Sequence, residues 1–118
     1  MIQFIFDPVF RQNFYYINAD NHKKYKRIMK KELKVDIDCD KTTDGGFQVI
    51  DVKGNLVAVI WCSKKKPEII VHECMHAVSW MHDYKGTKLC DETEETYCYS
   101  MQFLFGKIFY GDKYGKSF

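Results

Sequence analysis

The chain has 118 residues, of which 46% are hydrophobic and 29% are charged, and its formal net charge is +2. This length fits one compact domain over residues 1–118, and no apolar run approaches the roughly 20 residues that a membrane-spanning helix needs. So small a net charge does not by itself indicate a polyanionic partner. Five cysteines without a close CxxC pair favour free thiols in a reducing cytoplasm over a disulfide framework.

The first half of the chain predicts two short strands and a helix. The segments IQFIF and FYYI are runs of aromatic and branched residues bounded by turn residues, which is typical of strands. Asp20 or Asn21 is a suitable N-cap for the helix that follows. Four apolar residues recur at helical spacing and would face the core: Tyr25, Ile28, Met29 and Leu33.

The same predicted helix is strongly basic from Lys23 to Lys34, with Glu32 as the one acid in that stretch. Its basic residues are Lys23, Lys24, Lys26, Arg27, Lys30, Lys31 and Lys34. Such a cluster could contact nucleic-acid phosphates or an acidic protein surface. No signature of a nucleic-acid-binding fold accompanies it, so we favour a solvated helix face.

The second half of the chain begins with a predicted β-hairpin. FQVIDV and LVAVIW flank the tripeptide KGN, whose Gly54 and Asn55 suit a tight turn. We interpret LVAVIW as an edge strand that could align an extended peptide by main-chain hydrogen bonds.

Two helices are predicted after the hairpin. Pro67 fits the first position of a helix that ends near Lys85, before Gly86 as the C-terminal cap. The core-facing residues of this helix would be Ile70, Cys74, Ala77, Val78 and Met81. A last helix is expected over about residues 91–109, with Cys98, Met101, Leu104, Phe105 and Ile108 on its core side. The final GDKYGKSF is expected to fray.

These elements predict an α+β fold, in which a small sheet with a β-hairpin packs against the basic helix and two antiparallel helices.

The helix from Pro67 contains the motif HExxH, within the segment VHECMHAV. His72 and His76 are one helical turn apart and would present two imidazoles on one face. Catalytic zinc usually has three protein ligands and an open position for water, and Glu73 is suitably placed as the general base for that water. We therefore predict a Zn²⁺ site with His72 and His76 as ligands. The alternative is a helix whose histidines only hydrogen-bond locally.

His82 is one candidate for the third metal ligand. It follows His72 by ten residues, which is the histidine spacing of the metzincins, but Ser79 stands where that family has a glycine that turns the chain. On a continuous helix ten residues rotate by about 1000°, which leaves His82 about 80° from His72 and two turns beyond His76. We therefore expect His82 to miss the metal and to be a partly exposed helix residue.

VHECMHAVSWMHDYKG followed by DETEETYCYSMQFLF resembles the small, single-domain HExxH proteins that bacteriophages often encode. The resemblance covers about residues 47–109 and implies a minimal zincin-like, gluzincin-type domain with a metallopeptidase-like assignment. It also implies Glu95 as the third metal ligand, three residues before a small core residue that Cys98 would match. Asp91, Glu92 and Glu94 stay open as alternatives, because sequence does not fix the helix phase to one residue. Cys90, in the expected turn, is a weaker candidate.

These observations predict a zinc-dependent hydrolase, most naturally a metallopeptidase that cleaves a peptide or protein substrate. Glu73 would take a proton from the attacking water and return it to the leaving amine. Tyr84, Tyr97 or Tyr99 could donate a hydrogen bond to the transition-state oxyanion. The alternative is a metal-binding but non-catalytic interaction protein, such as a phage-encoded inhibitor of a host protein.

Overall fold

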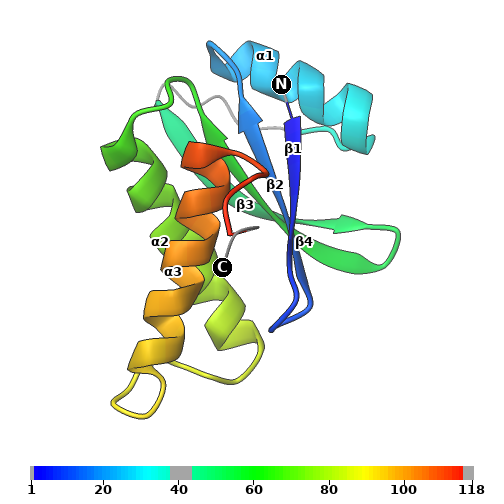
Figure 1. Cartoon of the computed structure of the whole chain (residues 1–118). Coiled ribbons are helices and arrows are strands. Elements are labelled where there is room, and N and C mark those ends of the chain that lie inside the picture. Colours follow the sequence, from blue (N-terminus) through cyan, green and yellow to red (C-terminus); the bar gives the residue numbers. More distant parts are fainter. Residues whose placement is uncertain (1, 38–43, 116–118) are drawn as a thin grey trace.

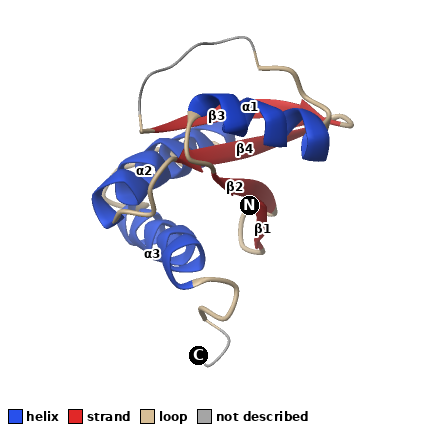
Figure 2. Ribbon diagram, turned by 90° about the horizontal axis from the view of Figure 1, so that it is seen from above, coloured by secondary structure: helices blue, strands red, loops and turns tan. Residues whose placement is uncertain are grey.

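The computed structural model describes residues 2–37 and 44–115 and has the expected α+β class. In chain order its elements are β1 (Ile2–Asp7), β2 (Gln12–Asn18), α1 (His22–Ile28), a π-helical segment η1 (Met29–Leu33), β3 (Gly45–Val52), β4 (Asn55–Cys62), α2 (Pro67–Tyr84) and α3 (Glu94–Tyr110). Helix α1 lies on one face of the sheet, whereas α2 and α3 lie on the other (Figure 1; Figure 2). In the described ranges we find no helix with the length and apolarity required to cross a bilayer.

The four strands are arranged in the order β1-β2-β4-β3. Strand β4 pairs in parallel with β2 and antiparallel with β3, so it lies inside the sheet, while β1 and β3 form its edges. The prediction that LVAVIW is an edge strand is therefore wrong. The physical reason is burial on both faces: Val57 to Cys62 are all buried, because helices cover the sheet on either side.

The turn of the β3–β4 hairpin is formed by Lys53 and Gly54, since Val52 pairs directly with Asn55. Both turn residues have positive φ, 53° and 88°, as the favoured two-residue hairpin turn requires. The predicted hairpin is confirmed. Asn55, however, is the first residue of β4 rather than part of the turn.

Side chains of β4 alternate between two hydrophobic cores. Ala58, Ile60 and Cys62 pack with α2 and α3, whereas Val57, Val59 and Trp61 pack with the α1 side. The predicted apolar face of α2 is confirmed, because its five residues are all fully buried: Ile70, Cys74, Ala77, Val78 and Met81.

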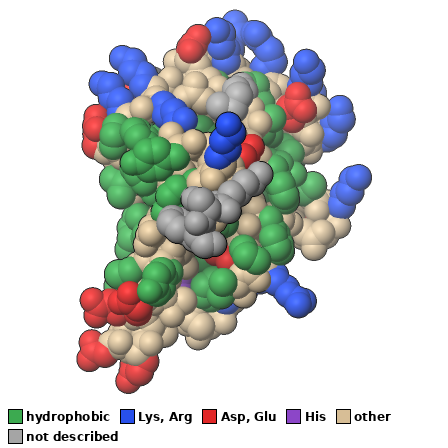
Figure 3. All heavy atoms as spheres, in the orientation of Figure 1, with side chains coloured by type: hydrophobic (Ala, Val, Ile, Leu, Met, Phe, Trp, Pro, Cys, Tyr) green, Lys and Arg blue, Asp and Glu red, His purple; other side chains and the backbone are tan. Residues whose placement is uncertain are grey.

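Helix α1 is capped as predicted by Asn21, whose Oδ1 accepts a hydrogen bond from the Lys24 amide at 2.9 Å. Its predicted apolar face is also confirmed, since Tyr25 and Met29 are buried against the sheet. Lysine and arginine side chains gather at the end of the molecule where α1 lies, and acidic side chains at the opposite end (Figure 3). Lys24 pairs with Asp20 and Lys30 with Asp36, which fits a solvated basic face.

Helix α3 begins at Glu94, three residues later than expected, because residues 91–93 form a turn. Thr93 Oγ1 stabilises this turn by donating to the Lys88 carbonyl oxygen at 2.6 Å. Leu104 and Ile108 are buried as predicted. Cys98 is exposed, so the prediction that it is a small core residue is wrong. Tyr97 and Ser100 are buried in its place.

Residues 111–115 of the GDKYGKSF segment pack as a turn rather than fray, and its last three residues, 116–118, lie outside the described residues. The Tyr114 ring packs against Gly106 so closely that a side chain at Gly106 would overlap it. Gln102 Nε2 also donates to the Tyr114 hydroxyl at 3.2 Å. These contacts fix the C-terminal turn against α3.

Gly45 lies where β3 passes the first turns of α2. A Cβ atom at Gly45 would meet the Trp61 carbonyl oxygen at 3.0 Å and Ile69 Cγ2 at 3.1 Å. A Cβ atom at the neighbouring Gly46 would meet only Trp61 Cε3, at 3.7 Å. The absence of a side chain at Gly45 therefore allows α2 to lie close to β3.

We predict that Gly45→Ala lowers the free energy of unfolding by about 1–3 kcal/mol, because the added methyl group overpacks the contact between β3 and α2. Gly46→Ala is the matched control, since its methyl group has ordinary van der Waals space in the same strand. Urea unfolding of both variants measures the difference. Equal effects of the two substitutions would show that the β3–α2 contact does not depend on Gly45.

Candidate metal centre

His72 and His76 lie one turn apart on the exposed side of α2, as predicted. Their Nε2 atoms are 3.3 Å apart. Two nitrogens that bind one zinc ion at about 2.0–2.1 Å with tetrahedral angles are themselves about 3.3–3.4 Å apart. The separation of the two Nε2 atoms therefore fits a shared metal ion.

Glu73 is the third member of this group. Its carboxylate is buried, and Oε1 lies 3.7 Å from His72 Nε2. One potential ligand atom from each of His72, Glu73 and His76 lies within 4.8 Å of the other two. Within residues 2–37 and 44–115, these side chains form the one group of three or more histidines, cysteines or acids with metal-binding spacing. The structure thus brings together the two predicted ligands and the predicted base.

The edge strand β3 runs beside this group. The Phe47 ring stacks on the His76 ring, with 6.3 Å between the centroids and 15° between the planes. At the start of the same strand, the Cβ position of Gly45 lies 3.5 Å from Glu73 Cγ. Neither contact is predictable from the sequence, because nothing in the local pattern of a strand shows which helix lies beside it.

Two thiols are buried near Glu73. Burial raises the pKa of Cys62 to about 12, and the negative charge of Glu73 adds to that increase. Burial, followed by the charges of Cys62 and Glu73, also raises the pKa of Cys74. Both side chains are therefore neutral thiols at neutral pH in the metal-free protein, and neither belongs to the metal-binding group. Cys74 is a core residue, as predicted.

The other described cysteines, Cys90 and Cys98, are exposed, and all four described cysteines are free thiols. Cys90 contacts Thr93 in the turn before α3, and it is not a member of the metal-binding group. Cys39 lies outside the described residues.

Glu95, the third ligand implied by the resemblance, is not a member of this group either. It is exposed on the first turn of α3, where the following Tyr97 and Ser100 contact His82. His82 lies six residues, or about 9 Å of helix, beyond His76. The first turns of α3 therefore lie beside the C-terminal part of α2, about 9 Å along the helix from His76, and α3 then runs back along α2 (Figure 1).

The geometry therefore gives no support to Glu95 as a ligand. The alternative acids, Asp91, Glu92 and Glu94, are also exposed at or before the start of α3 and lie outside the group.

His82 does not join the group, but it is completely buried rather than partly exposed as predicted. Its Nδ1 lies 3.1 Å from the Thr87 carbonyl oxygen and its Nε2 lies 3.1 Å from Ser100 Oγ. A carbonyl oxygen only accepts, so the proton is assigned to Nδ1, and Nε2 accepts from the Ser100 hydroxyl. His82 is thus a hydrogen-bonded link between α2, the following turn and α3.

Of the three tyrosines predicted as possible oxyanion donors, Tyr84 is the last residue of α2, and Tyr97 and Tyr99 lie in the first turns of α3. Tyr84 stacks on Trp80, and Tyr97 packs against His82 with 3.8 Å between the ring centroids. Tyr99 is 63% exposed on α3. None of these contacts links a tyrosine to His72 or His76, so no oxyanion donor is assigned.

We predict that acid weakens the fold through His82. Burial lowers the pKa of His82 below its usual value, whereas the hydrogen bond to Thr87 and the charge of Asp7 act in the opposite direction. Because the folded state binds fewer protons, the contribution of His82 is complete above the unfolded pKa of about 6.5 and is lost as the pH falls towards the folded pKa.

Urea unfolding in a chelator, at pH values from about 7.5 to 5.5, tests this expectation. The wild-type free energy of unfolding should decrease over this range, and His82→Gln should show a smaller decrease. An identical pH dependence in the variant would mean that other groups cause the effect.

Comparison with known proteins finds no matching protein-family model, no matching curated protein and no matching solved structure. The resemblance to phage HExxH proteins therefore stays a prediction based on motif residues, and any functional assignment depends on the geometry of His72, Glu73 and His76.

Proposed function

We propose that this chain is a zinc-dependent hydrolase that cleaves peptide bonds. The proposal depends chiefly on the 3.3 Å separation between the Nε2 atoms of His72 and His76. Residues four apart on a helix share a face, but only convergent side chains bring two ring nitrogens to the distance that one tetrahedral metal ion requires. A zinc ion bound there would lower the pKa of a water molecule and polarise a carbonyl group.

In this proposal Glu73 is the general base. It accepts a proton from the attacking water and transfers it to the leaving amine. Its position supports this role, because the carboxylate lies beside both imidazoles while its side chain is buried between α2 and β3. A carboxylate held in this way has little freedom to move away from the reacting groups.

Strand β3 supports a peptide as the substrate. It is an edge strand beside the histidines, and an extended peptide could pair with such an edge by main-chain hydrogen bonds. Phe47 would orient His76 through ring stacking. The four cysteines in the described residues are free thiols, which agrees with action in a reducing cytoplasm, the host cytoplasm if the chain is phage-encoded.

One observation favours a second candidate function. Glu73 is close enough to the imidazoles to be a ligand itself, and Glu95 is not a member of the group. If Glu73 completes the metal coordination, the chain lacks this base and is a metal-binding, non-catalytic interaction protein.

We predict about one zinc ion per chain, as expected for a mononuclear site, when the purified protein is analysed by elemental mass spectrometry. His76→Ala should lose stoichiometric zinc because it removes one of the two imidazoles. Glu95→Gln is the informative comparison: from the geometry described above it should keep its zinc. Loss of zinc from Glu95→Gln would instead support Glu95 as the third ligand, as the resemblance implies. Wild-type protein that folds and binds no zinc would contradict both candidate functions.

Glu73→Gln separates the two candidates. If Glu73 is the general base, this variant should keep zinc and hydrolyse a quenched-fluorescence peptide library at least about 100-fold more slowly than wild type. If Glu73 is a metal ligand, the variant should lose zinc instead, which would favour the non-catalytic candidate. Zinc retention with unchanged hydrolysis would exclude Glu73 from both roles.

A further inference from the structure

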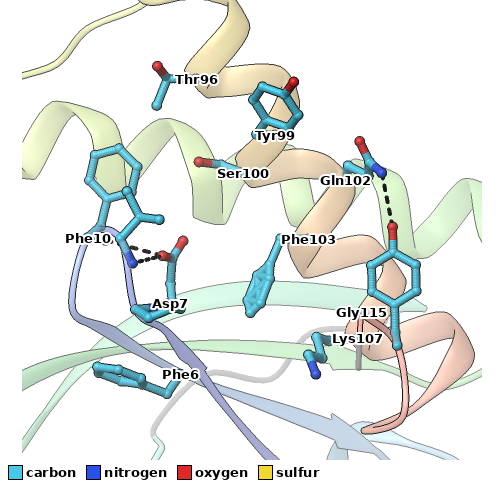
Figure 4. A pocket seen from close by; sticks show the side chains of 13 residues that line it. Phe6, Asp7, Phe10, Thr96, Tyr99, Ser100, Gln102, Phe103, Lys107 and Gly115 are labelled. Atoms are coloured by element: carbon cyan, nitrogen blue, oxygen red, sulfur yellow. Dashed lines mark hydrogen bonds between the residues drawn. The ribbon is translucent and has the colours of Figure 1, made fainter. Parts of the chain in front are cut away.

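A cavity of about 790 Å³ lies apart from the metal centre. It is bounded by the turn between β1 and β2, by one side of α3 and by the C-terminal turn (Figure 4). None of His72, Glu73 and His76 lines it. Its volume is within the range of about 300–1,000 Å³ that is typical of small-molecule sites.

The walls of this cavity are largely aromatic. Phe6 from β1 and Tyr99 from α3 are 46% and 63% exposed, and the side chain of Phe103 extends from α3 between them (Figure 4). Aromatic rings that remain exposed around a concave surface gain free energy when an apolar body covers them. The cavity therefore fits a ligand with an apolar body.

The remaining wall is fixed by specific contacts. Tyr114 packs on Gly106, and Gln102 donates a hydrogen bond to its hydroxyl group. From the edge strand, Gln3 Nε2 donates to the Lys107 carbonyl oxygen at 2.9 Å and to Asp112 Oδ1 at 2.8 Å. The C-terminal turn is thus attached to both α3 and β1, so the cavity is formed before any ligand binds.

Lys107 is the cation that lines the cavity. Its Nζ donates to the Asp112 main-chain oxygen at 3.1 Å and lies 5.8 Å above the centre of the Phe103 ring. In the described part of the chain no ion pair involves Lys107. The ammonium group therefore contacts the main-chain oxygen of Asp112 and an aromatic face, while the Asp112 carboxylate accepts from Gln3 and forms no ion pair with Lys107 among the described residues. A ligand carboxylate would give Lys107 a charge-assisted hydrogen bond that these contacts do not supply.

Asp7 is the carboxylate that lines the cavity, and it does not compete for Lys107. Its Oδ1 accepts hydrogen bonds from the Val9 and Phe10 amides at 2.8 and 3.1 Å. Gln3 contacts the Lys107 main-chain oxygen near the other end of β1, four residue steps or about 13 Å of strand away from Asp7. The acid and the cation are therefore at different ends of the cavity.

We propose that this cavity binds a small carboxylic acid with an apolar body. The carboxylate pairs with Lys107, and the apolar body packs between Phe103, Phe6 and Tyr99. This inference is independent of the proposed hydrolase function, because the two sites share no residue.

Calorimetric titration of the full chain with three probes of the same chain length tests the headgroup: decanoate, decanol and decylammonium, each below its micellar concentration. Decanoate should bind most tightly. Lys107→Met should lower its affinity about tenfold, to that of decanol, because the charge-assisted contact is removed while the apolar walls remain. Lys85→Met is the matched control and should bind like wild type, since Lys85 is an exposed lysine on Tyr84 outside the cavity.

A second variant tests whether the apolar body of the ligand binds in this cavity. Phe103→Ser should weaken binding of both decanoate and decanol, because it removes the aromatic ring between Phe6 and Tyr99. The urea midpoint of the variant shows whether its fold is intact. Binding of decanoate that is unchanged in Lys107→Met and Phe103→Ser would overturn the proposal. So would tightest binding of decylammonium, or no saturable binding of any probe to the wild type.

Discussion

The burial of one apolar stripe of α2 is the constraint on which the candidate metal centre depends. Five residues at helical spacing, from Ile70 to Met81, pack against β4 and α3 and thereby fix the rotation of the helix about its axis. With that rotation fixed, His72 and His76 face solvent, whereas Glu73, next to the buried Cys74, lies at the boundary of the core. Two exposed ligands beside one buried carboxylate are therefore a consequence of how the helix packs.

The central position of β4 determines where the two proposed sites lie in the fold. Because helices bury β4 on both faces, its neighbours β2 and β3 lie on either side of it, and β1 and β3 become the edges of the sheet. The metal centre lies beside the β3 edge, and the cavity borders the β1 edge. The group of His72, Glu73 and His76 is on α2 and the cavity is lined by α3, two helices that lie on the same face of the sheet (Figure 2). Separate edges allow each site its own approach from solvent.

The parts of the fold that follow from local patterns could be predicted from sequence, and the parts that depend on distant contacts could not. The helical period of α2 and the turn at Gly54 involve near neighbours, so they are readable in the chain. The parallel pairing of β2 with β4 joins Phe14 to Ala58, and the buried face of α3 includes Ser100, which contacts His82 from α2. No periodicity contains that contact, which is why Cys98 was expected on the buried side of α3.

The distribution of donor atoms around the candidate centre argues for an open site. Structural zinc sites are usually closed by four protein ligands, among which thiolates are frequent. Here the thiols of Cys62 and Cys74 are buried in the core and do not belong to the group formed by His72, Glu73 and His76. The donors that face outward are two imidazoles, with one carboxylate at the core boundary. A metal ion held by this set would keep coordination positions exposed to solvent, as hydrolysis requires and as a purely structural role does not.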